Sequence, residues 1–143
     1  MNQDSIRLLN ECHMGAHMAV SAIDAIMEDV QSGAMREHLD ACLKLHEKLE
    51  QESATALKRA GEDVKSPNSM MQKMAQIKSG MRMAIRPSDS KAAALVTDGC
   101  HVGTKMLAKR MNRSREADVQ SREIARRLIG VEDRTVSGLR PYL

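Results

Sequence analysis

The sequence predicts an all-α protein: an antiparallel four-helix bundle of two helical hairpins joined by a helical crossover. The first observation is composition, since the 143 residues include no Phe, no Trp and one Tyr, but 12 Met. Strands draw on aromatic and β-branched residues, whereas Ala, Leu, Met, Glu, Lys and Arg favour helices. The second observation is that apolar residues recur in steps of three and four over long segments. A β-sandwich or a parallel-sheet nucleotide fold is therefore not expected.

The first hairpin is expected over residues 5–60. Its first helix should run from Ser5 to Gln31, with Asp4 as its N-cap, and Ser32-Gly33 should form the turn. The second helix should run from Ala34 to Ala60. Both helices carry a heptad-like seam typical of antiparallel neighbours. The seam positions are Ile6, Leu9, His13, Ala16, Val20, Ile23, Met27 and Val30, then Met35, Leu39, Cys42, His46, Leu49, Ser53 and Ala56.

A crossover helix is expected over residues 67–86 and a second hairpin over residues 89–140. Pro67 suits the first position of a helix, and Pro87 ends the segment. Ser88 or Asp89 should cap the fourth helix, and Ser114 the fifth. The seam of the fifth helix is Ile124, Leu128, Val131 and Thr135. The length predicts a single domain over residues 1–143.

The methionines of the crossover segment allow two interpretations. Met70, Met71, Met74, Met81 and Met83 could pack this segment against the bundle, which is the plainer account. Alternatively, they could line a pliable surface for a protein partner or an apolar ligand, because Met side chains adapt to irregular shapes.

Charge is distributed unevenly along the chain. The net charge is −6 over residues 1–64, +4 over residues 65–99 and +5 over residues 100–143. The basic residues of the second hairpin have acids among them, namely Glu116, Asp118, Glu123, Glu132 and Asp133, and no aromatic residue is available for base stacking. This pattern predicts a solvated face that complements the acidic first hairpin, within one chain or across a homodimer, and argues against a nucleic-acid partner.

The cysteines and the hydropathy predict a reduced, cytoplasmic protein without a membrane partner. Cys12, Cys42 and Cys100 are odd in number and lie far apart in helical patterns, unlike a disulfide framework. They are expected to act as small buried hydrophobes. No apolar stretch is long enough to cross a membrane.

The two hairpins share an internal repeat. Cys12-His13-Met14-Gly15-Ala16-His17-Met18 matches Cys100-His101-Val102-Gly103-Thr104-Lys105-Met106 at Cys, His, Gly and Met. Common origin of the hairpins would explain the match, and chance between two amphipathic helices is the alternative. Gly15 and Gly103 lie mid-helix, where Gly costs about 1 kcal/mol relative to Ala. They are expected to allow close helix approach, or alternatively to open space for a ligand.

The histidines suggest a metal site. His17, His46 and His101 are expected at similar depth in the bundle, with His13 and Cys42 as further candidates. Imidazole and thiolate ligands would suit a transition metal, Zn, Fe or Cu, or haem. The alternative is that each histidine is a core or boundary residue hydrogen-bonded to a carboxylate or a carbonyl group.

Two hairpins joined by a helical crossover resemble the ferritin-like superfamily, and most closely its small bacterial four-helix-bundle domains. The di-iron members of that family use Glu on two helices and Glu-x-x-His on the other two. This sequence contains no Glu-x-x-His: Asp40, Glu50, Arg126 and Thr135 stand three residues after Glu37, Glu47, Glu123 and Glu132. The sequence also lacks a phosphate loop and a nucleophile elbow. We therefore expect a non-enzymatic binding or interaction protein with a degenerate di-metal site, or alternatively a metal or haem protein.

Overall fold

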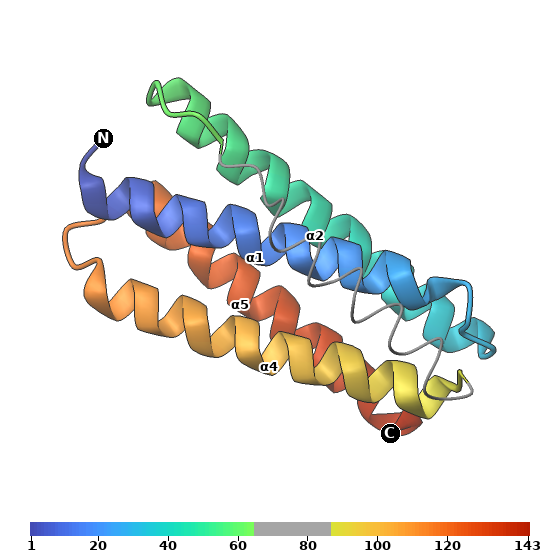
Figure 1. Cartoon of the computed structure of the whole chain (residues 1–143). Helices are drawn as coiled ribbons and strands as arrows, with labels where there is room; N and C mark the ends of the chain where they lie inside the picture. The colour runs from blue at the N-terminus through green and yellow to red at the C-terminus, as the bar shows by residue number, and fades with distance from the viewer. Residues whose placement is uncertain (65–86) are drawn as a thin grey trace.

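The computed structural model describes residues 1–64 and 87–143, and this part of the chain is a bundle of four α-helices (Figure 1). They are α1 (Gln3–Met27), α2 (Gly33–Arg59), α4 (Asp89–Arg113) and α5 (Val119–Leu139), followed by a 3-10 turn, η1 (Arg140–Tyr142). The described residues form no strand. The predicted all-α four-helix bundle is confirmed. The predicted crossover helix over residues 67–86, with its methionines, lies outside the described residues.

Short polar side chains set the ends of the first two helices. Asn2, rather than Asp4, caps α1, because its side chain accepts a hydrogen bond from the backbone N–H of Ser5 at 2.9 Å. Helix α1 ends at Met27, earlier than the predicted Gln31. Ser32 caps α2 by accepting from the N–H of Met35 at 3.2 Å. The residues before Ser32 therefore form the turn and do not extend α1.

Of the two N-caps predicted for the second hairpin, the one for α4 is confirmed and the one for α5 is wrong. Ser88 caps α4, as predicted. Asp118, rather than Ser114, caps α5 by accepting from the N–H of Ser121 at 2.7 Å. The backbone N–H of Asp118 also donates to Ser5 Oγ at 2.8 Å. This contact with α1 holds the start of α5 in place, so Ser114 is left as the C-cap of α4.

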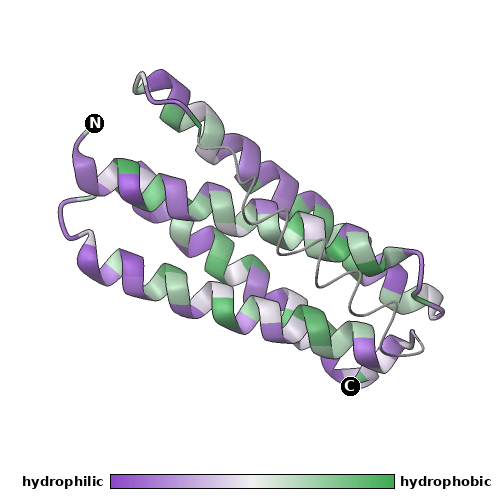
Figure 2. Cartoon of the chain, viewed as in Figure 1, coloured by the Kyte–Doolittle hydropathy of each residue, from purple (hydrophilic) through white to green (hydrophobic). Residues whose placement is uncertain are grey.

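The hydrophobic core consists of two clusters, one in each half of the bundle. One is built around Leu8, Leu9, Leu57, Leu107 and Leu128, and the other around Ile23, Ile26, Met35, Leu39 and Leu139. Figure 2 shows hydrophobic residues on the helix sides that face one another and hydrophilic residues outside. Between the clusters, α2 and α5 contribute two buried polar side chains, His46 and Glu132.

The predicted seams agree with burial best on α2, where all seven positions are buried. On α1, Ile6, Val20 and Met27 are half-buried and the other predicted positions are buried. On α5, Val131 is half-buried, and its neighbour Glu132 occupies the buried position. The steps of three and four on α5 therefore continue through a carboxylate and not through an aliphatic residue.

The connection between the hairpins returns the chain to the end of the bundle where α1 turns into α2. The carboxylate of Asp89, at the start of α4, accepts hydrogen bonds from the backbone N–H groups of Gln31 at 2.7 Å and Ser32 at 2.9 Å. Helix α2 ends at the opposite end, so α2 and α4 run in the same direction (Figure 1).

Ion pairs join the acidic first hairpin to the basic second one. Arg127 of α5 holds Glu52 of α2 through two hydrogen bonds of 2.6 and 3.0 Å. Arg110 of α4 lies 3.5 Å from Glu11 of α1. The expected charge complementarity therefore acts within one chain.

Across residues 1–64 and 87–143, no helix combines the length and the apolar character that crossing a membrane requires.

We predict that Asp89→Ala lowers the free energy of unfolding by about 1 kcal/mol, because two backbone N–H groups in the α1–α2 turn lose their acceptor. Urea unfolding followed by circular dichroism measures the change. Asp24→Ala, at an exposed position of α1, serves as the control and should cost nothing measurable. An equal loss in both variants would contradict a tie between the turn and α4.

Candidate functional site

A groove lined mainly by apolar side chains lies between α1 and α4. It has a volume of about 340 Å³ and is bounded by side chains between residues 11 and 26 of α1, by Asp29 just after this helix, by side chains between residues 95 and 107 of α4, and by Glu132 of α5. We call it the α1/α4 groove. Its volume falls within the range of about 300–1,000 Å³ that is typical of small-molecule sites.

Small residues on both helices create this space. The groove is lined by Gly15, Ala19, Ala22 and Ala25 on α1 and by Gly99 and Gly103 on α4. A Cβ atom added at Gly99 would meet no atom within 4 Å, so this position faces open space. Val102 and Met106, which also line the groove, are 56% and 48% exposed. If Leu stood at these Gly and Ala positions, its side chains would fill the groove.

The two glycines of the internal repeat meet neighbouring side chains of α5. A Cβ at Gly15 would lie 3.7 Å from Cδ2 of Leu128, and a Cβ at Gly103 would overlap Oε1 of Glu132. Leu128 and Glu132 are four residues apart and therefore share one face of α5. The expected close approach is therefore seen at Gly103, whereas a Cβ at Gly15 would make an ordinary contact. Both glycines also line the groove.

Glu132 places a buried carboxyl group in the groove. The residue is 2% exposed, and its Oε2 accepts a hydrogen bond from Thr104 Oγ1 at 2.9 Å. Its Oε1 accepts no hydrogen bond from the described residues. Burial raises the pKa of Glu132 to about 7, although the Thr104 hydrogen bond opposes this shift. The expectation that Glu132 belongs to a solvated face is wrong, because Glu132 follows Leu128 by one helical turn on the inward face of α5.

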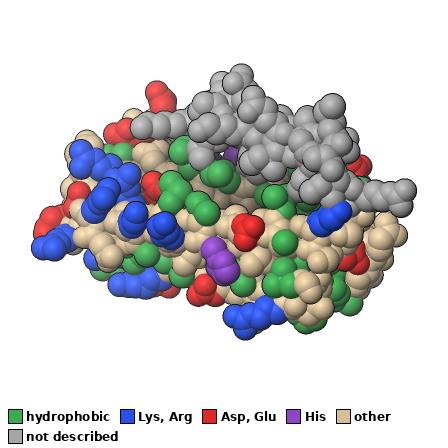
Figure 3. All heavy atoms as spheres, turned by 60° about the horizontal axis from the view of Figure 1, so that its bottom comes forward, with side chains coloured by type: hydrophobic (Ala, Val, Ile, Leu, Met, Phe, Trp, Pro, Cys, Tyr) green, Lys and Arg blue, Asp and Glu red, His purple; other side chains and the backbone are tan. Residues whose placement is uncertain are grey.

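The charged side chains that line the groove are all acidic. They are Glu11, Asp29, Asp98 and Glu132, and no Lys, Arg or His is among the described lining residues. Arg110 pairs with Glu11 from outside the groove. Figure 3, which brings the lower side of Figure 1 forward, shows apolar side chains exposed near acidic ones, with Lys and Arg gathered toward one end.

His13 and His17 lie on the side of α1 that faces α2. His17 Nδ1 lies 2.6 Å from Glu50 Oε1, and His13 Nδ1 lies 3.2 Å from the backbone oxygen of Glu50. The two rings are stacked, with centroids 6.4 Å apart. One nitrogen of each imidazole is therefore held by Glu50 of α2, in agreement with the alternative interpretation of core or boundary histidines that bond to a carboxylate or a carbonyl group.

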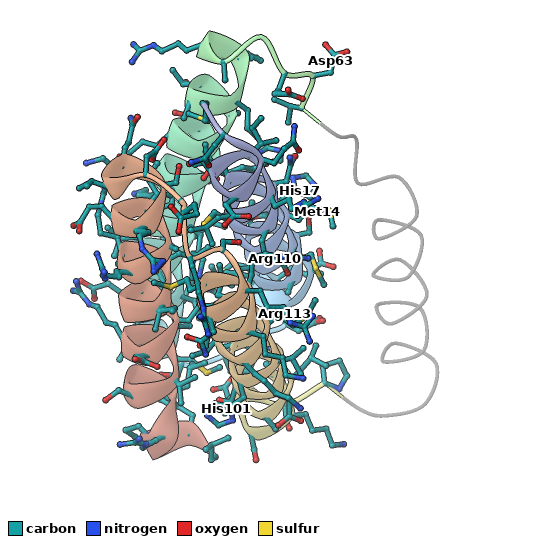
Figure 4. The ribbon with its side chains drawn as sticks, turned by 90° about the vertical axis from the view of Figure 1, so that its left-hand side faces the viewer. Met14, His17, Asp63, His101, Arg110 and Arg113 are labelled. Carbon is teal, nitrogen blue, oxygen red and sulfur yellow. The ribbon has the colours of Figure 1, made fainter. Side chains whose placement is uncertain are left out.

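His46 and His101 lie in opposite environments. His46 is fully buried, its Nδ1–H donates to the carbonyl oxygen of Cys42 at 2.8 Å, and burial lowers its pKa. His101 is exposed, because the buried stripe of α4 passes through its neighbour Cys100. The expectation that His101 points into the bundle is wrong. Figure 4 shows His17 and His101 on different sides of the molecule.

The candidate metal ligands are therefore not gathered at one point. Within residues 1–64 and 87–143, no three His, Cys, Asp or Glu side chains are arranged to hold a metal ion, and residues 65–86 contain none of these residue types. His17, His46 and His101, with His13 and Cys42, do not form the mid-bundle cluster that the sequence suggested. The alternative function, a transition-metal or haem-binding protein, stays a prediction.

The three cysteines are buried, free thiols. Burial is the main cause that raises the pKa of Cys12 and of Cys100 to about 12, and it also raises the pKa of Cys42. A protonated thiol is a poor nucleophile and a poor metal ligand. This agrees with the expectation that they act as small hydrophobes, and Cys100 contributes to the wall of the groove.

Neither the groove nor the inward position of Glu132 was predicted from the sequence. One signal was present: beside the seam of α1 runs a second stripe in steps of three and four, which passes through Gly15, Met18, Ala22 and Ala25 between Glu11 and Asp29. A stripe of small residues flanked by acids is compatible with either close packing or open space. Only the position of α4 decides between these outcomes.

No family model, no curated protein and no solved structure matches this chain.

We predict that Glu132→Gln reduces the pH dependence of stability. The pKa of Glu132 is about 7 in the folded protein and about 4.3 in an unfolded chain. The folded state therefore binds the proton more tightly, and this contribution to stability is lost as the pH rises through 7. Between pH 5 and pH 9 the wild type should lose about 2–3 kcal/mol more than the variant.

Urea unfolding at both pH values measures this difference. Glu123→Gln, at an exposed position of α5, should behave like the wild type. Parallel pH profiles for the wild type and Glu132→Gln would contradict a raised pKa at Glu132.

We predict opposite effects for alanine at two glycines of α4. Gly103→Ala should lower the melting temperature, because the new Cβ would overlap the carboxyl group of Glu132. Gly99→Ala should raise the free energy of unfolding by up to about 1 kcal/mol, because Ala favours the helix and its Cβ meets no atom. Thermal unfolding at pH 7 compares the two. Stabilisation by both substitutions would refute close contact between Gly103 and Glu132.

Proposed function

We propose that the protein is a non-enzymatic binding protein that takes up an apolar small molecule in the α1/α4 groove. The observation that carries this proposal is a groove of about 340 Å³ with aliphatic and Met walls and a single buried carboxyl group. Small-molecule sites combine a mostly apolar lining with a few placed polar groups. Met14, Met18 and Met106 line the groove, and Met side chains adapt to the shape of a ligand.

The geometry gives less support to the alternative functions. A metal or haem protein would need ligands that converge, but His17 contacts Glu50 whereas His46 donates to the backbone of Cys42, and the described residues contain no group arranged to hold a metal ion. Two of the basic side chains that a nucleic-acid surface would use, Arg110 and Arg127, are paired with acids of the first hairpin. The positions of the histidines and the pairing of these arginines therefore favour neither metal or haem binding nor nucleic-acid binding over the binding of a small molecule.

The relationship to ferritin-like domains is also a proposal. Parallel α2 and α4 require one long connection between the hairpins, and ferritin-like folds use a single long crossover. This connectivity supports the relationship. The homodimer, a protein partner and the cytoplasmic location stay predictions.

The proposal predicts a graded response to ligand length. Each methylene that a ligand buries contributes about 0.8 kcal/mol, so Kd should tighten about fourfold for each CH₂ from 1-hexanol to 1-decanol. Isothermal titration calorimetry measures this directly, and it avoids intrinsic fluorescence, which the absence of Trp makes weak.

A pair of variants locates the binding. Gly99→Leu fills the groove and should abolish alkanol binding, because Gly99 lines it and faces open space. Gly130→Leu makes the same change on α5, where a Cβ also meets no atom but which does not line the groove. It should bind like the wild type. No alkanol binding by the wild type, or equal binding by both variants, would refute the proposal.

A further inference from the structure

Among the described residues that line the α1/α4 groove, the charged side chains are all acidic. Glu11 and Asp29 lie at the two ends of the α1 wall, Asp98 lies on the α4 wall, and Glu132 lies between the helices. No basic side chain is among the described lining residues, although the whole chain carries a net charge of +3. The charge of the described lining residues is therefore complementary to a cation and not to an anion.

Within the described part of the chain, only one of the two carboxylate oxygens of Glu132 accepts a hydrogen bond. Thr104 satisfies Oε2 of Glu132, but Oε1, which lies beside Gly103, accepts no hydrogen bond from the described residues. Glu132 as a residue is only 2% exposed and borders the groove, so its carboxylate has little access to water, and a poorly hydrated charge is costly. A bound group that donates to Oε1 would remove this cost, and a positively charged donor would also balance the charge.

We propose that the ligand of the groove is a single-chain aliphatic amine, whose ammonium group donates a hydrogen bond to Oε1 of Glu132 while its chain lies between α1 and α4. This inference rests on the proposed function, because it assigns the ligand class of the same groove. Glycine at position 103 brings the backbone of α4 close to the carboxylate, and the apolar walls receive the chain.

The dimensions of the groove suit such a ligand. On α4, Gly103 is eight residues from Leu95, the far end of the lining, which corresponds to about 12 Å of helix. The wall over this length includes Val96, Gly99, Cys100 and Val102. A saturated chain of about ten carbons can lie along this wall with its head at Glu132. A carboxylate head in the same place would face Glu132 without a compensating cation.

Three ligands with the same ten-carbon chain test the inference: decylammonium chloride, 1-decanol and sodium decanoate. Titration calorimetry at pH 8 keeps Glu132 mostly ionised, since its pKa is about 7. We expect decylammonium to bind the wild type at least about tenfold more tightly than 1-decanol, because hydrogen bonds to charged groups are stronger than neutral ones. Decanoate should bind more weakly than 1-decanol.

Variants separate the head group from the chain. Glu132→Gln should lose the preference for the amine and bind both ligands with the affinity of 1-decanol, which also shows that the variant is folded. Glu123→Gln removes an exposed acid from the same helix outside the groove and should keep the full preference. Gly99→Leu should lose both ligands.

The outcomes distinguish the two proposals. If 1-decanol binds but decylammonium binds no more tightly, or decanoate binds as well as the amine, the inference is wrong and the proposed function survives. If Glu132→Gln keeps the amine preference, the ammonium group does not sit at Glu132 and the inference is likewise overturned. If none of the three ligands binds, the proposed function fails with it.

Discussion

The size of the side chains between helices is the constraint on which this structure depends. With no Phe or Trp and one Tyr, the bundle can fill its interior only with Leu, Ile, Val, Met, Ala and Cys. Where long aliphatic residues meet, as around Leu39 and Leu49 of α2, the interior is closed. Where α1 and α4 present Gly and Ala to each other, side chains do not fill the interval and a groove remains. The closed core and the open groove follow from the same packing rule applied to different residues.

Glu132 shows how a bundle of this kind tolerates a buried acid. Burial of an ionised carboxylate is unfavourable, and its pKa rises accordingly. Thr104 supplies one hydrogen bond, and Gly103 supplies the room for the second oxygen. An aliphatic residue at position 132 would therefore make the folded protein more stable than Glu132 does. The rest of the inward face of α5 is largely apolar. A polar group held at a cost inside an apolar groove is the feature expected of a binding site.

The internal repeat places like residues in unlike surroundings. Cys12 and Cys100 are both buried, and Gly15 and Gly103 both approach α5. His13 is buried and hydrogen-bonded to the backbone of Glu50, whereas its counterpart His101 is exposed. The Cys and Gly residues of the two halves of the repeat therefore have the same packing role. The His residues of the two halves do not have the same role. The repeat therefore does not place His101 inside the bundle, although it aligns His101 with the buried His13.

The sequence by itself determined the helical character of the four described segments and the buried seam of α2, and it narrowed the cap of α4 to Ser88 or Asp89, because hydrophobic spacing and cap preference are local properties. It also indicated that the two hairpins attract each other through opposite charge. Only the tertiary structure decided that Glu132 and not Val131 turns inward, that His101 faces solvent, and that the small residues of α1 and α4 enclose a groove. Adjacent stripes on one helix differ by a rotation of about 100° per residue, so which stripe is covered depends on where the other three helices lie.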